Sequence, residues 1–208
     1  MSTYCLKCKG LRHIKVKDYW QRCDCLEKEV LFDKYKQAGI EPVYYEYNWR
    51  LCKVEFNNVK KRIRKIEGMA RSIALGIHKR SRKTFCICGK PGSGKETVSS
   101  LFLKECINRG LTGKLVTVDE LIESEFDDNL RFNMTEIIKY DVICLRLGFE
   151  KLTKLNGYVI EKLWDKRRAR GLFTFFTSRE PLEKFRGLYG INLYKLFKND
   201  VQEYIMDD

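Results

Sequence analysis

Residues 84–95 read TFCICGKPGSGK, in which five β-prone residues run into a glycine-rich G-x-x-x-x-G-K loop. An apolar pattern through Leu101, Leu103 and Ile107 follows and predicts a helix. This order of strand, loop and helix is the context that a phosphate-binding loop requires. Successive backbone N–H groups of such a loop wrap the β-phosphate, and the helix N-terminus adds its positive dipole. The sequence therefore predicts a site for ATP or ADP.

The candidate nucleotide-binding residues form one run: Gly89, Lys90, Pro91, Gly92, Ser93, Gly94, Lys95, Glu96 and Thr97. Lys95 is expected to reach the β- and γ-phosphates. Glu96 stands where these loops carry the Ser or Thr that binds Mg²⁺, and Thr97 comes one position late. Glu96 can repel the phosphates, so the sequence leaves magnesium coordination open.

Beyond the loop, strand-like and helix-like segments alternate. Strands that alternate with helices form a mainly parallel sheet covered on both faces, so the expected fold class is α/β, a P-loop core flanked by helices. In chain order the segments are the strand 114–118, the helix 119–126, the strand 140–145, a helix within 155–168 and the strand 172–178.

A basic helix is expected before the loop. Apolar residues recur at steps of three and four over 57–79, while cations occupy the other faces. Two interpretations stay open: a solvated helix face, or a contact to single-stranded DNA beside the phosphate site. The candidate nucleic-acid residues are Lys60, Lys61, Arg62, Arg64 and Lys65.

Four cysteines near the N-terminus have the spacing of a zinc knuckle. They form a C-x-x-C pair and a C-x-C pair on either side of an expected hairpin: Cys5, Cys8, Cys23 and Cys25. Four thiolates suit tetrahedral zinc and leave no open position for a catalytic water, so the site is expected to be structural. His13 replacing one thiolate, and four unligated thiols, stay as alternatives. The other five cysteines lie mainly in apolar segments and are expected in the core.

Three domains follow from this pattern. The zinc knuckle is expected at 1–26, and a linker helix with an aromatic segment at 27–56. The P-loop core is expected at 57–208. The aromatic run VYYEYNW at 43–49 either packs on that core or grips a partner or an adenine base.

Composition narrows the class of protein. Lysine and arginine outnumber aspartate and glutamate by 41 to 28, and a net charge of +13 favours a polyanionic partner over a role in solubility alone. No apolar stretch approaches the roughly 20 residues that cross a bilayer, and the N-terminus lacks the pattern of a signal peptide. We therefore expect a cytoplasmic protein without a membrane partner.

Taken in order, these motifs resemble those of the DnaC/DnaI-type helicase loaders, AAA+ P-loop ATPases of bacteria and phages, over nearly the whole chain. The matching stretches are CLKC, CDCL, QAGIEPVYYEYNW, GKPGSGKETVSSLFLKE, LGFEKLT and FFTSREP. The resemblance implies a loader or primosome assembly factor in DNA replication. It also implies two partners, a replicative hexameric helicase and single-stranded DNA, and leaves self-association open.

The hydrolytic positions that the resemblance implies are replaced. Two acidic residues are expected just before Leu147-Gly148, but Leu145 and Arg146 stand there, and Glu150 matches a later position of the pattern. An acid at that strand end would hold Mg²⁺, and its neighbour would activate water. No catalytic residue is therefore assigned.

Two further positions of the pattern are changed. Arg179 occupies the place of the sensor 1 asparagine, and Asn192 stands where a trans-acting arginine is expected, with Lys195 as a stand-in for the sensor 2 residue. Each lost group would contribute separately to stabilising charge in the transition state. We predict ATP binding with weak or absent hydrolysis.

Two other functions remain open. The chain could inhibit or compete with a helicase loader, since an inhibitor needs the same docking surfaces. It could also be a hydrolysis-active loader in which Thr97, Asp141 and Glu150 act in a rearranged geometry.

Overall fold

The phosphate loop follows the inner strand of a parallel sheet. A computed structural model describes residues 5–76, 84–126, 134–148 and 154–207. Its main sheet has five strands in the order β4-β5-β6-β3-β7, and every neighbouring pair is parallel. The strands are β3 (Thr84–Cys88), β4 (Gly113–Thr117), β5 (Val142–Arg146), β6 (Phe173–Ser178) and β7 (Val201–Ile205). The predicted α/β class with a parallel sheet is confirmed.

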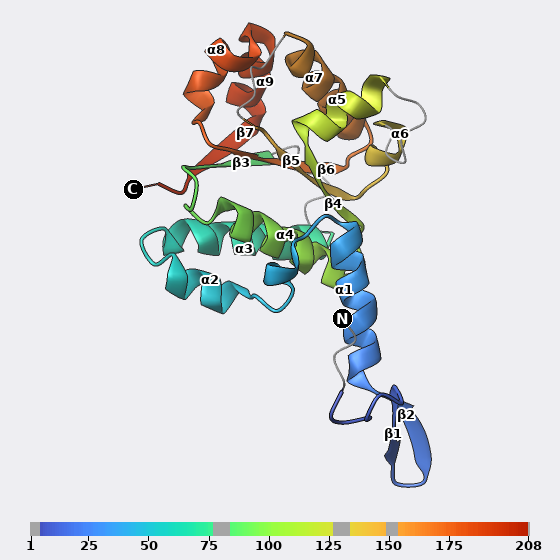
Figure 1. Ribbon diagram of the computed structural model, residues 1–208. Coiled ribbons are helices and arrows are strands. Elements are labelled where there is room, and N and C mark those ends of the chain that lie inside the picture. The colour runs from blue at the N-terminus through green and yellow to red at the C-terminus, as the bar shows by residue number, and fades with distance from the viewer. Residues whose placement is uncertain (1–4, 77–83, 127–133, 149–153, 208) are drawn as a thin grey trace.

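Helices cover both faces of this sheet (Figure 1). One face carries α3 (Lys60–Ala74) and α4 (Lys95–Asn108), with α2 (Trp49–Glu55) and the 3₁₀ turn η1 (Pro42–Tyr44) outside them. The other face carries α5 (Val118–Phe126), α6 (Met134–Ile137), α7 (Lys154–Ala169), η3 (Leu182–Lys184), α8 (Phe185–Tyr189) and α9 (Ile191–Asp200).

Alternation along β3 divides the core into two layers. Phe85 and Ile87 belong to the cluster under α3 and α4, whereas Cys86 and Cys88 belong to the cluster under α7 and α9. Side chains of a strand point alternately to its two faces, and every residue of β3 is buried because both faces are covered. This burial fixes the strand that leads into the phosphate loop.

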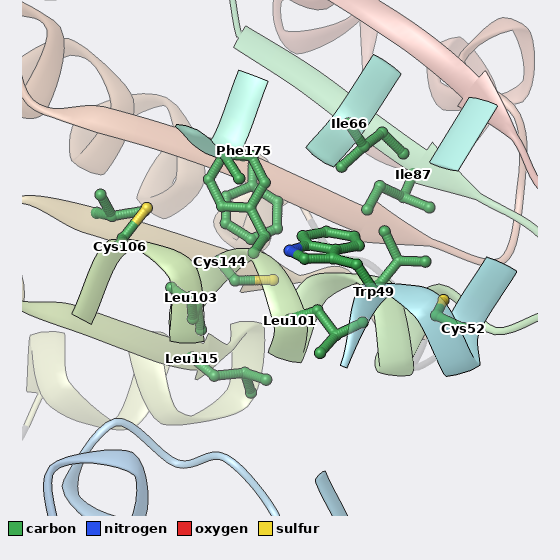
Figure 2. Packing of buried hydrophobic residues seen from close by; sticks show 14 of the residues in the cluster. Trp49, Cys52, Ile66, Ile87, Leu101, Leu103, Cys106, Leu115, Cys144 and Phe175 are labelled. Carbon is green, nitrogen blue, oxygen red and sulfur yellow. The ribbon is translucent and has the colours of Figure 1, made fainter. Parts of the chain in front are cut away.

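The segment before α3 packs on the core. Figure 2 shows Trp49 beside Ile66, Ile87 and Leu101, with Cys52 on the neighbouring turn of α2. Tyr44, Tyr45 and Tyr47 contact the same cluster. The aromatic run therefore packs on the core, as one of its two interpretations predicted. The prediction of five core cysteines is also confirmed, since all are buried: Cys52, Cys86, Cys88, Cys106 and Cys144.

The N-terminal hairpin lies at the far end of a long helix (Figure 1). Strands β1 (His13–Val16) and β2 (Tyr19–Arg22) pair antiparallel, and α1 (Asp24–Gln37) runs from the hairpin to the core. Helix α1 contacts α4, the helix that follows the phosphate loop. In the parts of the chain that the structure describes, no helix is both long and apolar enough to cross a bilayer.

Candidate functional site

Positive φ angles or close contacts favour glycine at three positions of the phosphate loop. Gly92 and Gly94 have φ angles of +82° and +85°, which L residues rarely adopt. A Cβ on Gly94 would lie 2.7 Å from Cζ of Phe56, and a Cβ on Gly89 would lie 2.4 Å from Oγ of Ser93. The loop can therefore fold tightly against the side chains of Ser93 and Phe56, and sequence reasoning had not linked Phe56 to it.

The lysine of the loop is held by the loop itself. Lys95 is buried, its Nζ donates to the carbonyl oxygen of Lys90 at 3.0 Å, and Oε1 of Glu96 lies 3.2 Å away. Glu96 sits in the first turn of α4, where the helix dipole favours a carboxylate. A phosphate that binds Lys95 must therefore compete with Glu96.

One polar atom in the loop fits an anionic ligand. Oγ of Ser93 is buried and has no hydrogen-bond partner among the described residues. Buried polar groups normally have partners, because an unsatisfied one costs about 1–3 kcal/mol. A phosphate oxygen would accept from this hydroxyl, so the donor set of the loop fits a nucleotide.

The C-terminal residues contact the start of the same loop. The carboxylate of Asp207 accepts the backbone N–H of Lys90 with both oxygens, at 2.8 and 2.9 Å. Nη1 of Arg62 on α3 donates to the backbone oxygen of Asp207 at 3.4 Å. Sequence reasoning missed this contact because it did not predict β7, the strand that carries Asp207 to the loop.

The described carboxyl end of β5 offers no acid to the loop. Leu145 is fully buried and Arg146 is partly exposed. The next two residues, Leu147 and Gly148, also lack a carboxylate. Parallel strands end at one edge of a sheet, and this end of β5 therefore shares an edge with the loop after β3. A magnesium-holding carboxylate is missing at Leu145 and Arg146, as the sequence indicates.

The rearranged catalytic set is not brought together. Asp141 lies just before β5, at the opposite edge of the sheet, where its carboxylate accepts from the N–H and the hydroxyl of Thr112 at 2.8 and 2.7 Å. Thr97 is buried on α4. Glu150 lies outside the described residues. Asp141 is thus too far along the strand to act at the phosphate loop.

The other replaced positions lie beyond the sheet. Arg179 is exposed directly after β6, and Lys195 is exposed on α9. The structure does not describe the side chain of Asn192. The roles that the resemblance implies for these three positions therefore stay predictions.

A buried lysine joins the aromatic segment to the helix of the phosphate loop. Nζ of Lys104 on α4 donates to the carbonyl oxygens of Tyr44, Tyr45 and Tyr47 at 2.6, 2.7 and 2.6 Å. Burial lowers the pKa of Lys104 to about 8, and the three carbonyl oxygens favour the charged amine that remains at neutral pH. The segment before α3 is thereby tied to α4, which begins at Lys95.

The four N-terminal cysteines converge on one point. Their sulfur atoms all lie within 4.8 Å of one another: Cys5, Cys8, Cys23 and Cys25. The Cys5–Cys23 and Cys8–Cys25 sulfur distances are 3.7 and 3.5 Å. A zinc–sulfur bond of about 2.3 Å in a tetrahedron gives sulfur pairs roughly 3.8 Å apart. The cluster therefore fits one zinc ion, and His13 is not part of it.

The thiol chemistry of this cluster also suits a cation. Backbone N–H groups of Cys8 and Lys7 lower the pKa of Cys5 to about 7, whereas burial, followed by its neighbouring thiols, raises the pKa of Cys25 to about 12. Thiolate is the form that binds metal, and a divalent cation would favour it at all four positions. The residues could thus hold zinc as a structural ion.

The five candidate nucleic-acid residues on α3 do not share one environment. Lys61, Arg64 and Lys65 are exposed, whereas Lys60 and Arg62 are partly buried, and Arg62 contacts Asp207. Exposed residues at i, i+3 and i+4 lie on one helix face. Three cations therefore form an outward-facing group, which we call the α3 basic face: Lys61, Arg64 and Lys65.

Solved structures of DNA replication proteins have a similar fold. The crystal structure of DnaI aligns at a TM-score of 0.57 and 19% identity, covering 68% of this chain and 82% of that chain. The DnaC helicase loader gives 0.55 and 18%, covering 67% and 86%. The initiator DnaA bound to AMPPCP and single-stranded DNA gives 0.53 and 14%, covering 67% and 45%. Neither a protein-family model nor a curated protein sequence matches this chain.

At these identities the likeness concerns the fold. The chain shares the fold of these proteins over about two thirds of its length, and a four-cysteine module consistent with zinc precedes it. The fold and the zinc-type module expected from the sequence are therefore confirmed.

Proposed function

We propose that the protein is a helicase loader of the DnaC/DnaI type, a primosome assembly factor that binds a replicative hexameric helicase in the cytoplasm. The observation that carries this proposal is the likeness of its core to the DnaC helicase loader and to DnaI. The cysteine cluster at the N-terminal end of α1 supports it, because a module held away from the core suits docking on a partner. Leu6 and Leu11 of this module are exposed apolar residues that a protein partner would cover.

The nucleotide of this loader would be ATP or ADP, held by residues 89–97. The glycine conformations, the buried Lys95 and the unpaired Ser93 hydroxyl support it. DnaA, which has a similar fold, was solved with the ATP analogue AMPPCP. Hydrolysis would be weak or absent, because β5 ends without the acids that hold magnesium and activate water.

Single-stranded DNA would lie along the α3 basic face. Arg62 links α3 to Asp207 at the loop, so this helix is adjacent to the phosphate site. The charge of the chain, +13, supports a polyanionic partner. Lys60 and Arg62 would contribute less than the three exposed cations.

A helicase complex is the first expected result. When the zinc-loaded chain is mixed with a replicative helicase hexamer, the two should co-migrate in size-exclusion chromatography. The helicase should then be loaded onto circular single-stranded DNA, equally well with ATP and with a non-hydrolysable analogue, since binding rather than turnover would drive the step.

The outcomes separate the candidate functions. A complex that blocks loading by a competent loader would favour the inhibitor or competitor. Loading that requires hydrolysable ATP would favour an active ATPase. Absence of any complex with the helicase would contradict the proposal.

A further inference from the structure

The hairpin presents two chemically different faces. In an antiparallel pair, directly opposite residues lie on the same side, and alternate residues point to opposite sides. His13 is opposite Arg22, and Lys15 is opposite Trp20. The face that these residues form is called the cationic hairpin face: His13, Lys15, Trp20 and Arg22. The reverse face carries Ile14, Val16, Tyr19 and Gln21.

The tryptophan of this face is open to solvent. Trp20 is 64% exposed, whereas Trp49 and Trp164 are 8% and 5% exposed and pack in the core. A hairpin with two strands has no layer to cover it, so Trp20 gains nothing from the fold of the core. The exposed ring of Trp20 is therefore available for contact with a partner that binds aromatic rings.

The charges of the face point to an anionic partner. His13, Lys15 and Arg22 are all exposed, and the ion pairs of the described residues use neither Lys15 nor Arg22. Two acids next to the hairpin hold other cations, since Asp24 binds Lys7 and Glu29 binds Arg12, and a third, Asp18, lies in the hairpin turn outside this face. The face thus has an aromatic ring among cations and carries no carboxylate of its own.

We propose that the cationic hairpin face binds single-stranded DNA, with a base stacked on Trp20 and backbone phosphates on Lys15 and Arg22. Sites for single strands combine aromatic platforms for bases with cations for phosphates. An unpaired base is needed, because stacking on an exposed ring requires a free face of the base. This contact goes beyond the proposed function, which places the strand on α3.

The cysteine cluster gives the face its rigidity. Cys23 follows β2 directly, and its backbone N–H donates to the carbonyl oxygen of Arg12, just before β1, at 2.8 Å. The cluster thus closes the open end of the hairpin. A fixed platform loses little conformational entropy when a base stacks on it.

Tryptophan fluorescence tests the proposal on the full zinc-loaded chain. Oligothymidylate should quench the wild-type tryptophan emission to a saturating level, because Trp20 is exposed while Trp49 and Trp164 are buried. Trp20→Phe should lose this quenching but keep its affinity, measured by anisotropy of labelled DNA, within about threefold. Trp20→Ala should weaken binding roughly tenfold, while Tyr19→Ala, on the reverse face, should not.

A variant of the α3 basic face separates the two DNA contacts. Replacing Lys61, Arg64 and Lys65 with alanine should weaken binding and flatten its salt dependence, by roughly 0.7 in log–log slope for each lost phosphate contact. Quenching at saturation should persist. An unchanged slope would count against DNA on α3 and leave the hairpin contact standing.

Four results would overturn the hairpin contact. In the first two, DNA binds without quenching the wild type, or DNA does not bind at all. Trp20→Ala, with zinc content equal to wild type, can bind DNA as tightly as Tyr19→Ala. Trp20→Ala can also lose the helicase complex while keeping DNA affinity, which would make the face a protein-docking surface.

Discussion

Replacing Arg167 with methionine is expected to lower the free energy of unfolding by about 3–5 kcal/mol. Arg167 on α7 is fully buried. Its guanidinium donates to the carbonyl oxygens of Tyr140 and Phe173 at 2.7 and 2.6 Å, and its Nε to Oγ1 of Thr174 at 2.8 Å. Longer contacts, of 3.3 to 3.4 Å, reach the carbonyl oxygens of Ile137, Ile138 and Asp141.

The loss is large because these acceptors have little access to water. Burial lowers the pKa of Arg167 to about 9, so the side chain remains charged at neutral pH. Methionine fills the volume but leaves the carbonyl oxygens at the starts of β5 and β6 without this donor. Arg167→Lys keeps the charge with fewer donors and should fall between wild type and Arg167→Met.

Chemical denaturation measures this effect. Arg167→Met should shift the midpoint to lower denaturant at an unchanged slope. The matched control is Lys166→Met on the same helix, which is exposed and should change stability by less than about 0.5 kcal/mol. Equal midpoints for the two variants would show that the buried guanidinium does not hold these strands.

Loss of zinc is the second large effect. Replacing Cys23 with serine should reduce the zinc content of purified protein from one per chain to near zero, because a hydroxyl is a poor substitute for a thiolate ligand. Cys23 is fully buried within the cluster. A small module without a large core takes its folding energy from the metal, so residues 5–23 should lose protection against hydrogen exchange.

The rest of the chain should keep its fold in this variant. The hairpin lies at the far end of α1 from the sheet, so the core does not depend on it (Figure 1). Cys52→Ala, which removes a core cysteine outside the cluster, is the control and should retain full zinc. Wild-type protein without zinc under reducing, chelator-free conditions would contradict the four-thiolate site.

Acidification should release the same zinc. Protons compete with the metal for the thiolates, so apparent zinc affinity falls as pH drops. The Cys23→Ser experiment and this titration share one readout, the zinc content per chain.

The local patterns of the sequence were enough to predict much of the fold. Strand β3, the glycine loop and α4 follow from residues adjacent in sequence, and the cysteine pairs are recognisable by spacing alone. Apolar periodicity predicted a basic helix that starts at residue 57, and in the structure this helix begins at Lys60. These features depend on contacts within one element or between neighbours, which periodicity reports directly.

Long-range contacts could not be predicted in this way. Strand β7 was missed because it is short, with mixed exposure along VQEYI, and it becomes a strand by pairing with β3, more than 100 residues earlier. Lys104 and Arg167 read as ordinary helix cations, yet their partners are carbonyl oxygens of distant segments. Every residue has a backbone carbonyl oxygen, so the sequence does not show which of them a lysine or arginine contacts.

A loader that does not hydrolyse ATP would use nucleotide only as a ligand. Nucleotide could then shift the protein between conformations by the difference in its affinity for each. Lys104 offers a physical link for such a shift, since it joins the aromatic segment to the helix that begins at Lys95. Glu96 pairs with Lys95, so the strength of this ion pair would lower the affinity of the loop for phosphate.

The fate of bound ATP tests the central claim most directly. ATP labelled on its γ-phosphate is incubated with the protein and Mg²⁺, and the nucleotide is recovered from the complex and identified. We predict that wild type retains intact ATP and that Lys95→Ala retains none, while Lys166→Ala, which changes an exposed side chain on α7 outside the loop, binds as wild type. Failure of wild type to retain ATP, or recovery of ADP with phosphate release that depends on Lys95, would contradict the account.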